Sequence, residues 1–263
     1  MTVPLSVAIV CKNAERTIER AVRSVVPLAS EIIALDSGST DRTIEILRDH
    51  GAIVEEVEWQ GYIRTKQMAF DRCTRPWILN LDADESIDET LVASIRRAIE
   101  ADDATVAGYE VNRKMWYLGS YLEHAWQPEW RLRLVRLGRA RFAGLDPHDH
   151  IEILPDDDGR LGTVARLGGT MRHDAFETIG EFLARQVAHS VAGASSLAAR
   201  GERGSRLRLV TSPPMAFLKQ MILKQAWRDG PRGWVAAAST AAATLMKHMI
   251  LIEKTRTPDR PDR

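Results

Sequence analysis

The sequence has 263 residues, and its 36 Lys and Arg balance its 36 Asp and Glu, so the formal net charge is zero. A hydrophobic content of 44% and a charged content of 27% are typical of soluble globular proteins and exclude a wholly disordered chain. The length allows one large domain, or one domain with an appendage. Two cysteines, Cys11 and Cys73, are too few for a disulfide framework and favour a reducing compartment.

Strand-like segments recur through the first part of the chain. Apolar runs predict four strands, at residues 5–11, 31–37, 52–59 and 77–81. A helical pattern follows each strand, so that strand and helix alternate four times. This alternation predicts an α/β fold with a doubly wound, mostly parallel sheet.

Capping residues mark where these helices are expected to begin and end. Asn13 is expected to cap the first helix, and Gly51 to close the second. A third helix is expected around residues 64–72. Ser86 and Glu89 have the spacing of a capping box at the start of the fourth.

The second half of the chain is less regular. Its pattern is aromatic after residue 105, rich in glycine and charge over residues 138–169, and helical over residues 176–200. From Pro213 onward, two apolar helices are expected on either side of the segment RDGPRG. We therefore expect one α/β domain over residues 1–200 and a basic, apolar helical tail over residues 201–263.

Three carboxylates follow the fourth predicted strand in the segment PWILNLDADES. Side chains alternate along an extended backbone, so Asp82 and Asp84 are expected on one side, next to Glu85 in sequence. Ligands of open α/β sheets bind beyond the carboxyl ends of the strands, where Asp36 also lies. Paired carboxylates suit a hard divalent cation that bridges substrate phosphates, which predicts Mg²⁺ or Mn²⁺. As an alternative, these acids cap the helix that begins near Asp88.

Five segments occur in an order expected of one enzyme family. They are SVAIVCKNAERTIERAVRSV, EIIALDSGSTDRT, WILNLDADE, WYLGSYLEHAWQPEWRLRLVR and PHDH. The chain resembles the family-2 glycosyltransferases, and among them the bacterial lipopolysaccharide-core glucosyltransferases. This resemblance spans nearly the whole chain. It implies a GT-A nucleotide-diphospho-sugar fold and an inverting, metal-dependent transfer of a hexose, glucose favoured, from a UDP-sugar to a glycan or glycolipid hydroxyl.

The resemblance also implies residues on the donor side. Asp36 resembles the acid that contacts the nucleotide base or ribose, and Asn13 lies in the first nucleotide loop. Asp82 and Asp84 match the DxD pair, in which Asp82 supports the nucleotide sugar and the metal, and Asp84 ligates the metal directly.

Basic residues are implied near the diphosphate. Arg64 and Lys66 in GYIRTKQ resemble such residues, and the alternative is that both lie on an ordinary solvated helix face. His173 matches a late histidine that completes the metal or diphosphate site. A histidine in a polar loop is otherwise a plain hydrogen-bonding residue.

The acceptor side needs a carboxylate that takes the proton of the attacking hydroxyl. Asp149 in DPHDH lies at the family's position for a histidine and acid pair, and is favoured as the base. Glu129 in WQPEWRLR is the second candidate, and its alternative role is to pair with Arg131 or Arg133. Five aromatic residues nearby suit an acceptor groove or a core: Trp116, Tyr117, Tyr121, Trp126 and Trp130.

Other functions fit parts of the sequence. A phosphatase-like hydrolase would use Asp82 as its nucleophile, but its strand is normally near the N-terminus. A sugar nucleotidyltransferase would need a glycine-rich N-terminal phosphate loop, which the sequence lacks. A non-catalytic nucleotide-sugar-binding membrane scaffold would not need a base beside the metal pair.

The tail bears on where the protein acts. Residues 201–263 contain 12 Lys and Arg and 5 Asp and Glu, which favours a polyanionic partner, here a membrane surface and not nucleic acid. The uncharged stretch over residues 234–246 is too short to span a bilayer. No signal peptide is evident at the N-terminus. We expect a cytoplasmic protein, peripheral on the inner face of the membrane, with packing on protein or dimerisation as the alternative.

Overall fold

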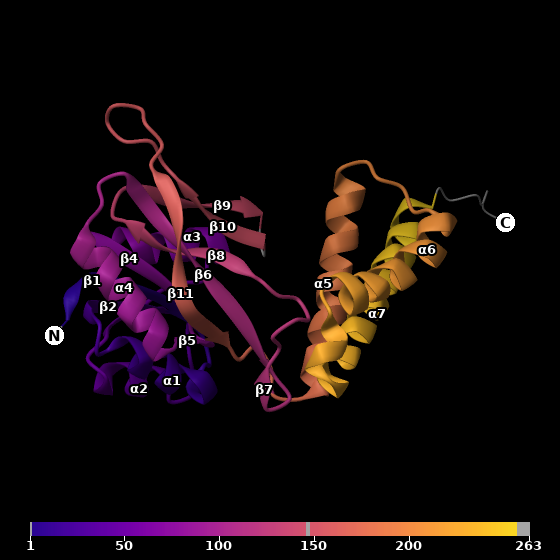
Figure 1. Cartoon of the computed structure of the whole chain (residues 1–263), viewed down its shortest axis with the longest axis horizontal. Coiled ribbons are helices and arrows are strands. Elements are labelled where there is room, and N and C mark those ends of the chain that lie inside the picture. Colours follow the sequence, from indigo (N-terminus) through magenta and orange to yellow (C-terminus); the bar gives the residue numbers. More distant parts are fainter. Residues whose placement is uncertain (1, 146–147, 257–263) are drawn as a thin grey trace. The chain divides into compact units, whose positions relative to one another are not determined.

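The computed structural model describes residues 2–145 and 148–256. The chain divides into two compact units, each made of two segments (Figure 1). Unit 1 comprises Met1–Lys114 and Glu129–Asp174, and unit 2 comprises Met115–Pro128 and Ala175–Arg263.

The sheet of unit 1 has a parallel half. β1 pairs in parallel with β2 and β4, and β2 pairs in parallel with β3. The strands span Val3–Cys11 (β1), Ala29–Asp36 (β2), Ile53–Glu56 (β3) and Trp77–Asp82 (β4). All four expected strands are present, and their pairing confirms the expected α/β architecture.

An antiparallel half extends the sheet beyond β4. β8 pairs with β4, β6 pairs with β8, and β5 pairs with β11, all antiparallel. These strands span Glu85–Ile87 (β5), Val106–Tyr117 (β6), Trp130–Arg136 (β8) and Thr163–His173 (β11), and the full order is β3-β2-β1-β4-β8-β6-β11-β5. The sequence did not predict this half, because β6 is buried at its start and half-buried along most of its remaining length, so no single period runs through it.

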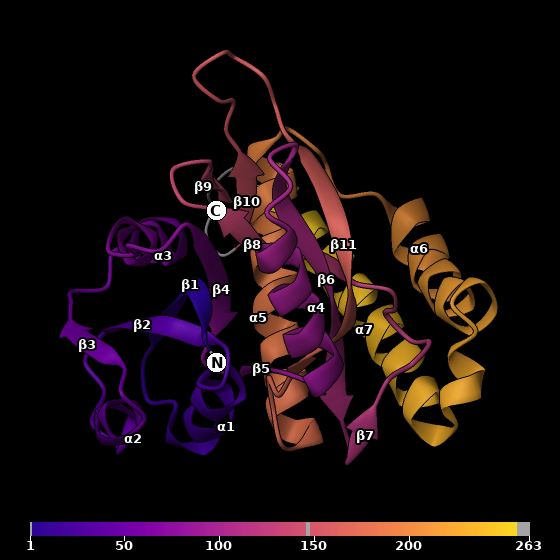
Figure 2. The ribbon, with the colours of Figure 1, turned by 60° about the vertical axis from the view of Figure 1, so that its left-hand side comes forward.

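Two separate apolar layers cover the parallel strands. α1 (Glu15–Val25), α2 (Thr43–Asp49) and α4 (Glu89–Ala101) pack on one face, and α3 (Tyr62–Asp71) packs on the other with the hairpin β9 (Ala140–Leu145)–β10 (His148–Ile153). Figure 2 shows β1, β2 and β4 between α3 and the pair α1 and α2. Strand alternation divides β4 between the layers, with Leu79 and Leu81 on the α1 side and Ile78 on the α3 side.

Two of the expected helix caps are wrong. Asn13 lies outside α1 with a positive φ of 49°, and its Oδ1 accepts a hydrogen bond from Thr40 N at 2.8 Å. Ser86 lies in β5, so it cannot begin a helix. The residue that caps α4 is Asp88, whose side chain accepts from Leu91 N at 2.7 Å. Asp88 is the N-cap of α4 because its side chain satisfies a backbone N–H that the helix leaves unpaired.

Unit 2 is a helical unit with its own core. Its helices are α5 (Ile179–Ala199), α6 (Arg206–Leu218) and α7 (Pro231–Thr255), with a π-helical turn η1 (Lys219–Leu223) and a 3₁₀ turn η2 (Ala226–Asp229) before α7. α7 packs against both α5 and α6 (Figure 1). The end of β6 also belongs to unit 2, where it pairs with β7 (Ser120–Tyr121). The core joins residues from both segments: Tyr117, Leu122, Ala125, Ala175, Phe176, Phe182, Met221, Ala226, Ala236 and Ala237.

The helical part differs from the expected tail. The expected boundary at residue 200 falls after α5, whereas α5 is grouped with α7 in unit 2. α6 begins at Arg206 and includes Pro213, which was expected to start a helix. Among the described residues, one helix, α7, is long and apolar enough to cross a membrane, a criterion that the core helix of a soluble protein also meets.

Candidate functional site

The carboxyl end of β4 lies at the centre of a charged cluster in unit 1. Asp82 is the last residue of β4 and shares the strand face of Ile78, which α3 and the β9–β10 hairpin cover. Lys66 of α3 approaches Asp82 Oδ1 at 2.8 Å, and Arg133 of β8 approaches Asp82 Oδ2 at 2.8 Å. Both oxygens of Asp82 therefore have a cationic partner.

Lys66 also reaches the β9–β10 hairpin. Its Nζ lies 3.0 Å from Asp149 Oδ2, so one buried ammonium joins β4 to β10. Asp149 belongs to the PHDH segment, in which Pro147 lies outside the described residues. Arg64, two residues before Lys66, is exposed, because positions two apart lie on nearly opposite sides of a helix. The structure thus brings Lys66 into the cluster and leaves Arg64 outside it.

A second row of ion pairs runs deeper in the sheet. Glu85 is buried in β5 and accepts from Arg133 Nη2 at 2.5 Å and from Arg113 Nη1 at 3.3 Å. Arg113 of β6 then donates two hydrogen bonds to Glu129, at 3.1 and 2.6 Å, and Arg131 donates two more, at 3.0 and 2.7 Å. Glu129 therefore pairs with Arg131, as its alternative role expected, and with Arg113 in place of Arg133.

These contacts change the acidity of the carboxyl groups. Burial raises the pKa of Asp82, but the charges of Arg133 and Lys66 outweigh burial and hold it far below its usual range. Burial likewise opposes ionisation of Glu129, yet hydrogen bonds from Arg113 lower its pKa to about 2. Burial disfavours the ammonium of Lys66, but Asp82 and Asp149 together more than compensate, so the pKa of Lys66 is raised. All three groups are charged at neutral pH.

Asp84 has a different partner from Asp82. β4 ends at Asp82 and a turn follows, so the alternation that would place the two acids side by side stops before Asp84. Asp84 Oδ2 lies 3.4 Å from His173 Nε2, at the end of β11. Burial, the largest single effect, raises the pKa of Asp84, but the hydrogen bond and the charge of His173 together lower it by more, with a net decrease.

A divalent cation fits the Asp84 and His173 pair only with help from a ligand. Within the described ranges, no group of three or more His, Cys, Asp or Glu side chains could hold a metal ion. Asp84 offers carboxylate oxygens, and the buried His173 Nδ1 has no hydrogen-bond partner among the described residues. Mg²⁺ commonly binds to one or two side chains, with substrate phosphates completing its shell. The donor set is compatible with such a site.

Hydrogen bonds connect the two loops that follow the carboxyl ends of β1 and β2. Asp36 is fully buried and accepts hydrogen bonds from Gly38 N at 2.9 Å and Ser39 N at 2.7 Å. Ser39 Oγ accepts in turn from Asn13 N at 2.8 Å. Hydrogen bonds of Asp36 and Asn13 thus join the loops after β1 and β2 into one continuous pair.

Sequence reasoning did not assign Glu85, Arg113 and Arg133 to the site. The available signal was Arg133, a buried cation in the alternating strand WRLRLVR. A buried guanidinium requires acidic partners, and the nearest unassigned acid in the sequence motif was Glu85. The Nε of Arg133 is buried and has no hydrogen-bond partner within the part of the chain that the structure describes.

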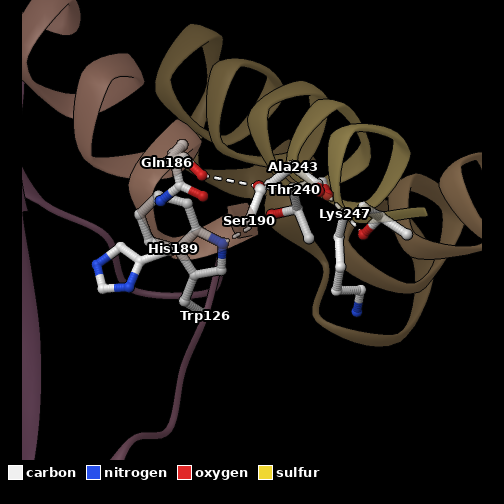
Figure 3. A pocket seen from close by; sticks show the side chains of 8 residues that line it. Trp126, Gln186, His189, Ser190, Thr240, Ala243 and Lys247 are labelled. Carbon is white, nitrogen blue, oxygen red and sulfur yellow. Dashed lines mark hydrogen bonds between the residues drawn. The ribbon is translucent and has the colours of Figure 1, made fainter. Parts of the chain in front are cut away.

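Unit 2 contains a separate pocket of about 280 Å³ (Figure 3). It is lined by Trp126, Gln186, His189, Ser190, Thr240, Ala243, Thr244 and Lys247. Trp126 Nε1 donates to Thr240 Oγ1 at 3.0 Å, which fixes the indole at the edge of the pocket. Among the expected acceptor-side aromatics, Trp126 lines a cavity, whereas Tyr117 is completely buried in the core of unit 2.

Comparisons with known proteins agree with these features. Residues 6–153 match the family model described as glycosyl transferase family 2. The lipopolysaccharide core biosynthesis glycosyltransferase LpsC of Rhizobium meliloti (strain 1021) is 30% identical over 260 residues, covering 94% of each chain. An uncharacterized glycosyltransferase of Rickettsia typhi (strain ATCC VR-144 / Wilmington) is 29% identical, covering 92% of this chain and 85% of that protein.

Solved structures with a similar backbone are more distant. S. aureus TarS 1–349 in complex with UDP-GlcNAc has a TM-score of 0.49 and 11% identity, covering 95% of this chain and 90% of that one. Glucosyl-3-phosphoglycerate synthase from Mycobacterium tuberculosis, in complex with Mn²⁺ and UDP-glucose, has a TM-score of 0.49 and 19% identity, covering 76% and 80%.

Proposed function

The chain belongs to glycosyl transferase family 2, and from that premise we propose an inverting transfer of a hexose from UDP-hexose, with UDP-glucose as the first donor to test. The acceptor is a hydroxyl of a glycan or glycolipid of the cell envelope. The name of the LpsC relative supports an acceptor in the lipopolysaccharide core. Membership of the family sets aside the phosphatase-like alternative.

One observation carries the assignment of roles. Lys66 contacts Asp82, on the proposed donor side, and Asp149, the proposed base, at 2.8 and 3.0 Å. The donor and acceptor halves of the reaction therefore meet at one cation. We assign the donor to unit 1, with Asp36 and Asn13 in the loops that receive the nucleotide.

Asp149 is the better candidate for the base. The acceptor oxygen forms a bond to the anomeric carbon, the bond from that carbon to the diphosphate oxygen breaks, and the acceptor proton passes to Asp149. Glu129 is a poor proton acceptor because hydrogen bonds from Arg113 and Arg131 lower its pKa to about 2. The nucleoside diphosphate leaves as an anion, and Lys66 supplies a nearby positive charge.

A bound Mg²⁺ or Mn²⁺ would offset the charge that develops on the departing diphosphate. Asp84 and His173 would hold the ion, and the donor phosphates would complete its coordination. Asp82 would support the donor through its contacts with Lys66 and Arg133.

The proposed place of work is the cytoplasmic face of the membrane. A lipid-linked acceptor is presented at a membrane surface, and the basic C-terminal segment is attracted to anionic lipid. We propose peripheral attachment and not a transmembrane span.

The decisive experiment is a donor screen of the purified full-length chain. UDP-glucose, UDP-galactose, UDP-N-acetylglucosamine and GDP-mannose are each tested for hydrolysis and for thermal stabilisation, with Mn²⁺, with Mg²⁺ and with a chelator. We expect stabilisation by a UDP-hexose, and metal-dependent release of UDP. A non-catalytic sugar-nucleotide sensor would be stabilised without turnover, and an unresponsive protein would contradict the proposal.

A further inference from the structure

α6 presents its apolar side chains outward. None of its residues is buried. Leu207 and Val210 are 72% and 71% exposed, and Leu218 is 45% exposed. The half-buried side of the helix, which packs toward α7, carries Leu209, Ser212, Pro213, Ala216 and Phe217. The helix therefore carries apolar residues on both sides, whereas an ordinary surface helix keeps its outer side polar.

The outward residues form one continuous face. At about 100° per residue, Leu207, Val210, Pro214 and Leu218 fall within an arc of roughly 80°. The face continues into η1, where Ile222 and Leu223 are 65% and 73% exposed. We call these six residues the α6 face.

Cations lie along both edges of the α6 face. Arg206 falls on one edge of the helix and Arg208 and Lys219 fall on the other, by the same helical geometry. All three are exposed. Arg208 also pairs with Glu202 Oε2 at 3.0 Å. An apolar stripe with basic residues at both edges is the pattern of a helix that lies in the interface of an anionic bilayer.

The helix is held firmly in this orientation. At its start, Gly204 N donates to Thr255 Oγ1 of α7 at 2.8 Å, and a Cβ on Gly204 would lie 2.4 Å from Ile252 Cα. After its end, Met221 is buried in the core of unit 2. The apolar face is therefore not turned inward by a simple rotation of α6.

A second exposed stripe in unit 2 lacks the cations. Ile179, Leu183, Val187 and Val191 recur every four residues along α5 and are 41–47% exposed. The positions that flank this stripe include Ala184, Gln186 and Ala188, none of which is charged. The α5 stripe thus provides a matched apolar control without charge complementarity to anionic lipid.

We infer that the α6 face is the surface by which this protein binds an anionic lipid bilayer, with its leucines in the acyl boundary and its basic edges on the headgroups. This inference rests on the proposed attachment to the cytoplasmic face of the membrane, and it specifies the surface that makes the contact. It differs from a transmembrane reading of α7, because it assigns the contact to an amphipathic helix lying parallel to the membrane.

The test is co-sedimentation of the full chain with vesicles. Vesicles of phosphatidylcholine alone are compared with vesicles containing phosphatidylglycerol, at low and high salt. We expect binding to the anionic vesicles at low salt. Leu207→Ser and Leu218→Ser should each lower the partition constant about tenfold. Arg206→Gln and Lys219→Gln should each lower it about fivefold, on anionic vesicles only.

Leu183→Ser and Val187→Ser on α5 are the control and should leave partition unchanged. Equal losses from both helices would overturn the assignment to α6. A wild-type chain that remains in the supernatant, or a dimer that Leu218→Ser dissociates in the absence of lipid, would also overturn it. Donor hydrolysis in solution is measured on every variant, so that lost catalysis with intact vesicle binding counts against the proposed function alone.

Discussion

The two units depart from the usual partition of side chains in opposite ways. Unit 1 places charge inside, where the buried Glu85, Lys66 and Arg133 pair with one another or with the half-buried Asp82. Unit 2 places apolar side chains outside, on α6. Buried charge and exposed apolar surface are both unfavourable for folding alone. The comparison supports two different proposed ligands: a charged sugar nucleotide for unit 1 and lipid for unit 2.

The largest effect is expected at Asp84, which tests whether the buried charge of unit 1 serves catalysis. Asp84→Asn should abolish metal-dependent turnover, because it removes the proposed carboxylate ligand. The fold should stay intact, since Asp84 follows a strand end and supports no core residue. Turnover with and without chelator and the melting temperature are measured. Asp49→Asn, an exposed acid on α2, is the control, and full activity of Asp84→Asn in chelator would refute the catalytic role.

A smaller loss is expected at the acceptor side. Asp149→Ala should lower sugar transfer on the order of 10²- to 10⁴-fold with little change in donor affinity, as for the loss of a general base. Glu129→Ala is compared under the same conditions, with donor affinity measured by titration. If Glu129→Ala loses transfer at normal donor affinity while Asp149→Ala keeps it, the two roles are reversed.

The smallest effect is expected at Glu129, in the pH dependence of the free energy of unfolding. The pKa of Glu129 falls from 4.5 to about 2 on folding, so between these values the unfolded chain binds more protons than the folded one. The stability contributed by Glu129 is therefore full above about pH 4.5 and is lost as the pH falls toward 2. Glu129→Gln should cost roughly 1–3 kcal/mol at pH 7.

Urea unfolding at a series of pH values measures this difference. The gap between Glu129→Gln and the wild type should narrow as the pH falls through the stated window. A constant gap from pH 7 to pH 3 would show that the ion pairs of Glu129 with Arg113 and Arg131 do not stabilise the fold.

Sequence reasoning reached the parallel half of unit 1 because its strands and helices are local. The apolar run ending at Asp82 and the buried face of α1 are each readable from neighbouring residues. The same reasoning identified Lys66 and Asp149 but not their contact, which joins residues 83 positions apart. It missed the role of Arg133, because an arginine in an alternating strand is normally an outward-facing residue.

Unit 2 was harder to predict for a physical reason. Its core joins Tyr117 and Leu122 to residues of α5 and α7, so no single stretch of sequence shows a complete apolar face. A sequence pattern shows that apolar residues share a face, but it does not show whether that face meets protein or membrane.

The interleaving of the two units has a consequence for how the chain is made. Unit 1 is not complete until β11, which ends at His173, has emerged from the ribosome. Tyr117 and Leu122 of unit 2 have already been synthesised by then. Their partners in α5 and α7 come later, so this short segment remains uncovered while unit 1 forms. A protein shortened after Asp174 would expose the same residues permanently. Expression of the sugar-transferring half alone therefore requires polar replacements at Tyr117 and Leu122, whereas truncation by itself would favour aggregation.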